Sequence, residues 1–167
     1  VDLSLAQMAA LGSTVAIFAG SEPGSTMSYV YALGFTTIGA ALFALTRTHE
    51  KGRVPQEAII GIVYVVASAA AILVANRVPR GGEAIQDILV GSLLWVTWPA
   101  ILKMAAVYAL LGVFHFVLRK RFLTISFEPE TALANGWSIR WWDFWFYLSF
   151  GVVITLSVPI AGVLLVF

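Results

Sequence analysis

The chain of 167 residues contains no cysteine and only two histidines. Disulfide bonds, thiolate metal sites and cysteine nucleophiles are therefore excluded within this sequence. Charged residues are scarce as well: they make up 11% of the chain, against about 25% in an average soluble domain. The net charge is +1, which gives no reason to expect a nucleic-acid partner.

Apolar residues are abundant instead, at 60% of the chain, and the mean hydropathy is +0.90. A domain of this size leaves much of its surface exposed, so one small core cannot hide so many apolar side chains. The expected solvent is therefore the lipid bilayer. We expect an all-α fold, a polytopic bundle of membrane helices that forms a single domain over residues 1–167.

Five stretches meet or approach the roughly 20 apolar residues that a helix needs to cross a bilayer. They cover residues 3–19, 28–46, 57–76, 98–118 and 142–167. The loops between them differ in charge. Loops 47–56 and 119–141 carry three and four basic residues, whereas loops 20–27 and 77–84 carry none and two. This asymmetry places the first two loops in the cytoplasm.

A sixth apolar stretch, residues 85–97, reads IQDILVGSLLWVT and is too short to span. The loop charges agree with one another only if this stretch does not cross the membrane. It is either a re-entrant segment that lines a path or an interfacial amphipathic helix. We expect Gly91 to lie at a break or at a close contact.

The segment between the last two predicted spans is polar and shaped like a short helix. Pro129 suits a first helical turn, Glu128 and Glu130 suit the positive end of the helix dipole, and Gly136 suits a helix end. Such an element is either a passive surface helix or a docking helix for a soluble partner. In the docking interpretation Ala132 faces water, and a charged replacement there leaves folding intact.

This segment resembles the coupling segment of zinc/manganese-type ABC transporter permeases. The matching residues are Phe127, Glu128, Pro129, Glu130, Ala132 and Gly136, with Glu128 where the family usually has Asp. Three further stretches resemble the same family in the same order: 53–64, then Glu83 with 87–95, and 161–165. Family members are longer at both ends, so the chain is expected to be part of a larger permease.

The resemblance implies the membrane subunit of a bacterial inner-membrane importer that works with several partners. Expected partners are a separate ABC ATPase that docks on the coupling helix, a second copy of the permease, an extracytoplasmic substrate-binding protein and the lipid bilayer. No G-x-x-x-x-G-K-[ST] motif occurs in the chain. ATP hydrolysis is therefore expected in the partner, with no enzyme activity and no cofactor in this subunit.

The expected cargo is a divalent ion such as zinc, manganese or iron, but one family motif is altered. Metal-transporting members usually pair an Asp with a His near the first helix, whereas this chain has Asp2 and Gln7. Asp2, Gln7, Gly91 and Ser92 are the transport-path candidates, and the metal ligands stay undefined. The alternatives are a permease for another substrate, such as a metal chelate, and a non-transporting or regulatory membrane scaffold.

Three polar residues in or beside the apolar stretches have simpler explanations. His115 is expected to make a headgroup contact or an interhelix hydrogen bond rather than bind metal. Glu57 and Asp143 are expected to stabilise helix dipoles at cytoplasmic helix starts.

Overall fold

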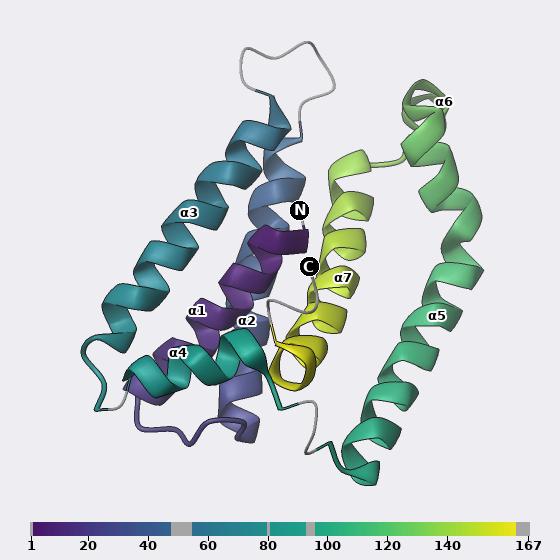
Figure 1. Cartoon of the computed structure of the whole chain (residues 1–167). Coiled ribbons are helices and arrows are strands. Elements are labelled where there is room, and N and C mark those ends of the chain that lie inside the picture. The colour runs from purple at the N-terminus through teal and green to yellow at the C-terminus, as the bar shows by residue number, and fades with distance from the viewer. Residues whose placement is uncertain (1, 48–54, 80, 93–95, 163–167) are drawn as a thin grey trace.

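The computed structural model describes residues 2–47, 55–79, 81–92 and 96–162. Over these residues the chain forms seven helices and no strand, which confirms the predicted all-α class (Figure 1). The helices are α1 (Asp2–Phe18), α2 (Thr26–Thr46), α3 (Gln56–Ala75), α4 (Gly81–Val90), α5 (Trp98–Phe127), α6 (Pro129–Ala134) and α7 (Ile139–Ala161).

Four of these helices, α2, α3, α5 and α7, are long and apolar enough to cross a membrane. The fifth predicted span, 3–19, corresponds to α1, which has 17 residues and is shorter than these four helices. It begins about midway along the bundle (Figure 1). Helix α5 is longer than its predicted span of 98–118. It runs unbroken for 30 residues to Phe127, so the basic residues at 119–121 lie on a helix and not in a loop.

The core of the bundle forms where α1 packs against α2, α3 and α7. Small residues let the backbones approach closely. A β-carbon at Gly12 of α1 would lie 2.6 Å from the carbonyl oxygen of Tyr31 and 2.7 Å from the α-carbon of Ala32. Close packing of this kind replaces the hydrophobic effect as the force between helices in lipid. The larger side chains of this core are Leu5, Phe43, Ile154 and Val158.

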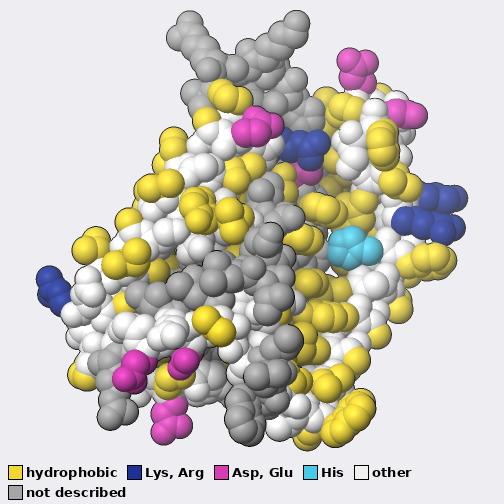
Figure 2. Space-filling view, in the orientation of Figure 1, with side chains coloured by type: hydrophobic (Ala, Val, Ile, Leu, Met, Phe, Trp, Pro, Cys, Tyr) yellow, Lys and Arg dark blue, Asp and Glu magenta, His cyan; other side chains and the backbone are white. Residues whose placement is uncertain are grey.

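Helix α5 lies at the edge of the bundle and packs against α6 and α7. Pairs of side chains at two places contact across α5 and α7. The hydroxyl groups of Tyr108 and Ser157 are 2.7 Å apart, and Nε2 of His115 is 3.2 Å from the hydroxyl of Ser149. Most of its other apolar side chains are exposed (Figure 2). Many apolar side chains of α2 and α3 are exposed as well. Such a surface suits lipid, not water.

The two ends of the bundle differ. The end of α2, the start of α3 and helix α6 lie at one end, and α4 lies near the other (Figure 1). The segments predicted to be cytoplasmic thus share one end. Helix α4 runs across the long helices, next to α1, α3 and α7. At 1.5 Å per residue its 10 residues extend about 15 Å, half of the roughly 30 Å hydrocarbon core.

The prediction that residues 85–97 do not form a spanning helix is confirmed, because α4 ends at Val90. The helix begins four residues earlier than the apolar stretch, at Gly81. Residues 93–95 lie outside the described part of the chain.

Candidate functional site

The connection between α5 and α7 is a sharp corner built by Glu128 and Pro129. Glu128 is both the C-cap of α5 and the N-cap of α6, with φ −133° and ψ 63°. Its backbone N–H still donates to the carbonyl of Thr124 at 2.8 Å. Pro129 has no N–H to continue the ladder, so α5 stops and α6 begins in a new direction.

Helix α6 is closed at its other end by Gly136. Gly136 has φ 72°, a conformation that glycine adopts at no steric cost. Its N–H donates to Leu133 at 2.9 Å, and the N–H of Trp137 donates to Ala132 at 3.0 Å. These two bonds form a Schellman motif, which satisfies carbonyls at the end of the helix. The predicted helix start at Pro129 and helix stop at Gly136 are both confirmed.

The prediction that Ala132 faces water is wrong. Ala132 is fully buried in a small cluster with Ile125 of α5 and Ile139 of α7, and Trp137 and Trp142 pack around it. The six-residue helix must be held by its neighbours, because it is too short to be stable alone. Ala132 therefore fixes α6 to both flanking helices and is not available for a partner.

The exposed face of α6 is mixed apolar and acidic. Phe127 is 79% exposed and Leu133 is 55% exposed, and Glu128, Glu130 and Ala134 are exposed beside them. Figure 2 shows acidic side chains at this tip of the molecule. We call these five residues the α6 surface. The family motif indicated Phe127, Glu128 and Glu130 as docking residues but not Leu133. A large apolar side chain within a short polar segment is the feature that could have indicated Leu133.

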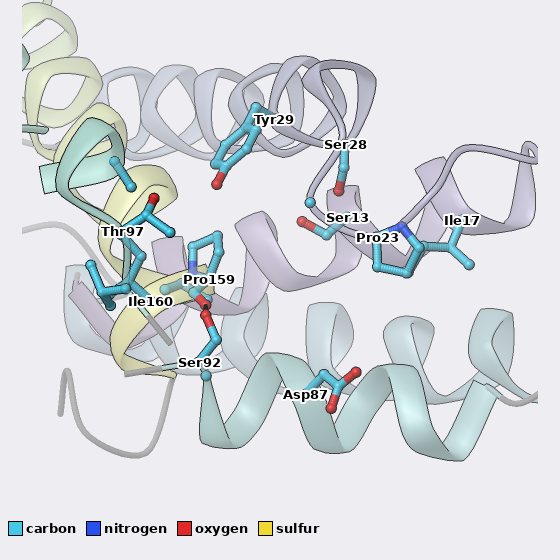
Figure 3. A pocket seen from close by; sticks show the side chains of 15 residues that line it. Ser13, Ile17, Pro23, Ser28, Tyr29, Asp87, Ser92, Thr97, Pro159 and Ile160 are labelled. Atoms are coloured by element: carbon cyan, nitrogen blue, oxygen red, sulfur yellow. Dashed lines mark hydrogen bonds between the residues drawn. The ribbon is translucent and has the colours of Figure 1, made fainter. Parts of the chain in front are cut away.

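A cavity of about 600 Å³ lies at the opposite end, and we call it the outer cavity. Its lining comes from α1, α2, α4, α7 and the start of α5, and it includes the predicted path residues Gly91 and Ser92. Ser13, Ser28, Tyr29, Asp87 and Thr97 contribute further oxygen atoms (Figure 3). The side chain of Asp87 points from α4 toward this space (Figure 3).

Gly91 and Ser92 join the end of α4 to the end of α7. Gly91 has φ 71°, and a β-carbon there would lie 2.6 Å from the carbonyl oxygen of Ile160. Ser92 donates its backbone N–H to Ile160 at 3.0 Å and its hydroxyl to Pro159 at 3.2 Å. The prediction of a break and a close contact at Gly91 is confirmed, whereas a role in transport remains a prediction.

The other two path candidates lie elsewhere. Asp2 and Gln7 belong to the first half of α1, and neither lines the outer cavity. Gln7 is half-buried, and the side chain of Asp2 lies outside what the structure describes. The structure therefore does not bring the four candidates together. Among the described residues, no three His, Asp or Glu side chains are grouped so as to hold a metal ion.

His115 makes the interhelix contact that the sequence predicted. Its Nδ1 is 2.9 Å from the carbonyl oxygen of Leu111, which can only accept, so this nitrogen carries a proton. Its Nε2 lies 3.2 Å from the hydroxyl oxygen of Ser149, which donates its own proton to the carbonyl of Phe146 at 2.7 Å. The ring also stacks on Phe122 at 5.2 Å between centroids.

The prediction that Asp143 stabilises a helix dipole at a helix start is wrong, because the first turn of α7 contains no acidic residue. Glu57 does lie in the first turn of its helix, α3. Asp143 is 5% exposed and forms an ion pair with Arg47 at the end of α2. The ion pair borders a second cavity of about 300 Å³, which we call the inner cavity. The sequence signal for this pair was one charge at the end of each of two neighbouring spans.

These features define a multi-pass α-helical membrane protein with a short, packed helix at one end and, at the other, a cavity whose mixed lining includes several oxygen-bearing side chains. Its sequence agrees with one family over nearly the whole chain. The ABC 3 transport family matches residues 4–167, and the chain belongs to this family.

Individual relatives are similar over most of this chain. It is 28% identical over 154 residues to the manganese transport system membrane protein MntC of Listeria innocua, which covers 86% of this chain and 53% of that protein. It is 24% identical over 149 residues to the manganese transport system membrane protein MntB of Synechocystis, covering 86% and 48%. The chain thus spans about half the length of these relatives.

One solved structure shows the same fold. PsaBC from Streptococcus pneumoniae in complex with Fab superposes with a TM-score of 0.74 at 17% sequence identity. The match covers 99% of this chain and 57% of that one.

Proposed function

We propose that the chain is part of the membrane-spanning permease subunit of a bacterial ABC importer for divalent metal ions, with manganese as the first ion to test. The family and the manganese-transport relatives support this assignment. In this proposal the protein lies in the inner membrane with a second copy of itself, an ATPase subunit binds at α6, and a substrate-binding protein delivers the ion at the other face.

The observation that carries the proposal is the construction of α6. A surface helix with no partner has no need of a rigid mount, yet this one begins at a proline corner, ends in a Schellman motif and is packed onto α5 and α7 through Ala132. It presents Leu133, and the last residue of α5 presents Phe127 beside it, so that two large apolar side chains are exposed at this end of the molecule. Exposed apolar groups at a water-facing end are typical of a protein interface.

The test uses the full-length protein produced together with its ATPase. Leu133→Arg places a charge on the exposed α6 surface without entering the packed cluster. We expect the ATPase to be lost on purification and manganese uptake to stop, because a docking contact that carries force must fit closely. Asn76→Arg is the matched control. It adds the same charge at an exposed position after the last residue of α3, at the end of the bundle opposite to α6.

Full recovery of the ATPase with Leu133→Arg would show that α6 is not the docking helix. Recovery of the ATPase by the wild-type protein without any metal uptake would favour the scaffold alternative.

A further inference from the structure

The inner cavity lies where four helices meet, just behind α6. Arg47 follows α2, Gln56 begins α3, Asp143 and Tyr147 belong to α7, and Ile125 lies near the end of α5. The first four carry polar groups that make two pairs, Arg47 with Asp143 and Gln56 with Tyr147. We call these four side chains the inner clamp, since they join three helices at one level: Arg47, Gln56, Asp143 and Tyr147.

Two contacts close the inner clamp. Arg47 forms an ion pair with Asp143, whose side chain is 7% exposed, while that of Arg47 is 27% exposed. The amide of Gln56 donates to the hydroxyl of Tyr147 at 3.2 Å and reaches the carbonyl of Phe43 at 3.5 Å. Phe43 is fully buried, and its ring meets that of Tyr147 edge to face at 6.0 Å. The end of α2 and the start of α3 are thus both fastened to α7.

The face of α7 that carries the clamp residues Asp143 and Tyr147 also carries the residue against which α6 packs. Ile139, Asp143 and Tyr147 are spaced four residues apart, so they lie on one face of one continuous helix. Ile139 packs against Ala132 of α6, one turn before Asp143. A displacement of α6 therefore acts on Ile139, and the helix passes it to the two clamp residues beyond.

The inner cavity leaves room for such a displacement. It separates the clamp from Phe122, Ile125 and Ser126 of α5, and Ile125 also belongs to the cluster that buries Ala132. The unit formed by α6 and the end of α5 therefore borders open space on the side that faces the clamp. Packed elements beside a void can shift between discrete arrangements, whereas a filled core resists movement.

We infer that the inner clamp is the positioning element through which movement of α6 reaches α2 and α3. This inference rests on the proposed function, because it takes α6 as the helix that the ATPase moves. An ion pair suits the role better than an apolar contact would. Buried pairs contribute little net stability over apolar residues of similar volume, but the guanidinium fork and the carboxylate hold one geometry.

The test measures manganese uptake per ATP hydrolysed, with the full-length protein and its ATPase in lipid vesicles. For Arg47→Met we expect the ATPase to bind as in the wild type, since Arg47 is not part of the α6 surface. Uptake per ATP should fall roughly tenfold, within the usual range for coupling between two sites. Arg47→Lys is the conservative variant: it keeps the charge, and we expect it to retain most of the uptake per ATP.

A merely structural role gives a different result. In that case uptake and ATP hydrolysis fall in the same proportion in Arg47→Met, so that uptake per ATP stays at the wild-type value. A lower melting temperature of Arg47→Met is expected in both cases, because the variant removes the ion-pair partner of the buried Asp143. Equal losses of uptake per ATP in Arg47→Met and Arg47→Lys would also overturn the inference, because stem packing and not the charge would then matter. Failure of the proposed function is distinguishable, because the wild-type protein itself would then take up no metal.

Discussion

Gly91 lies directly against Gly162, so that the end of α4 and the end of α7 meet backbone to backbone. Both residues have a positive φ, 71° and 74°. Two glycine breaks therefore face each other at the wall of the outer cavity. Ser92 completes the junction by donating to the last carbonyls of α7, which the helix itself leaves without partners.

This junction predicts that Gly91→Ala is strongly destabilising. The substitution forces a side chain into a left-handed conformation, at about 1–2 kcal/mol, and into the backbone at Ile160 and Gly162. We expect a loss of about 2 kcal/mol or more in the free energy of unfolding, because overpacking costs a further 1–3 kcal/mol or so. Melting of the purified protein followed by size-exclusion chromatography measures the effect.

The matched control is Gly24→Ala. Gly24 has nearly the same φ, 73°, but nothing lies within 4 Å of a β-carbon there. It isolates the conformational cost, and we expect a loss of about 1–2 kcal/mol. Equal melting temperatures for the two variants would mean that the contact between α4 and α7 is not close.

Most of the helices could be predicted from the sequence because lipid imposes a simple rule. Apolar stretches of about 20 residues become spans, and charges mark their ends. The boundaries of α2 and α3 lie within two residues of the predicted 28–46 and 57–76. Residues such as Pro129 and Gly136 could be placed because their backbone chemistry is local.

The positions that depend on neighbours could not be predicted. Ala132 has the same local pattern as an exposed helical alanine, and only the approach of Ile125 and Ile139 buries it. The pairing of Arg47 with Asp143 spans 96 residues of sequence, so no local pattern contains it. Helix α5 continued past Leu118 because basic side chains are compatible with a helix that leaves the membrane.

The orientation in the membrane is testable with single cysteines, because these 167 residues contain none. Asn76→Cys lies at the end of α3 that we expect to face outward, and Glu130→Cys lies on the α6 surface. An impermeant maleimide applied to intact cells should label the first and not the second. Gly81 is unsuitable as a probe, since a side chain there would overlap the backbone of Ala75.

Labelling of both variants after the cells are opened is the control for accessibility. Labelling of Glu130→Cys in intact cells, with Asn76→Cys protected, would invert the topology. In that event α6 could not meet an ATPase.

The contacts of His115 predict that loss of its contact with Ser149 lowers the stability only slightly, and that replacement of the ring leaves manganese uptake nearly unchanged. Ser149→Ala removes the hydroxyl that faces Nε2 and should cost about 0.6 kcal/mol, the mean for interhelix hydrogen bonds in a membrane bundle. His115→Gln should leave manganese uptake by the full-length protein within about twofold, a change of less than 0.5 kcal/mol. Uptake that vanishes in His115→Gln while the protein melts normally would assign the ring to the ion path.

The burial of Ala132 leads to the last prediction, which separates the mount of α6 from its exposed face. Ala132→Arg would place a charged side chain among Ile125, Ile139 and the two tryptophans, where no acidic group is part of the cluster. An unpaired buried charge costs several kcal/mol, so the variant should melt far below the wild type or fail to accumulate. Leu133→Arg carries the same new charge one residue later on the 55% exposed side, and its melting temperature should stay near that of the wild type. Thermal melting of both purified variants decides the matter. Equal stability of the two would mean that Ala132 is exposed in solution, that α6 is not fastened to α5 and α7, and that the route from α6 through Ile139 to the inner clamp does not exist.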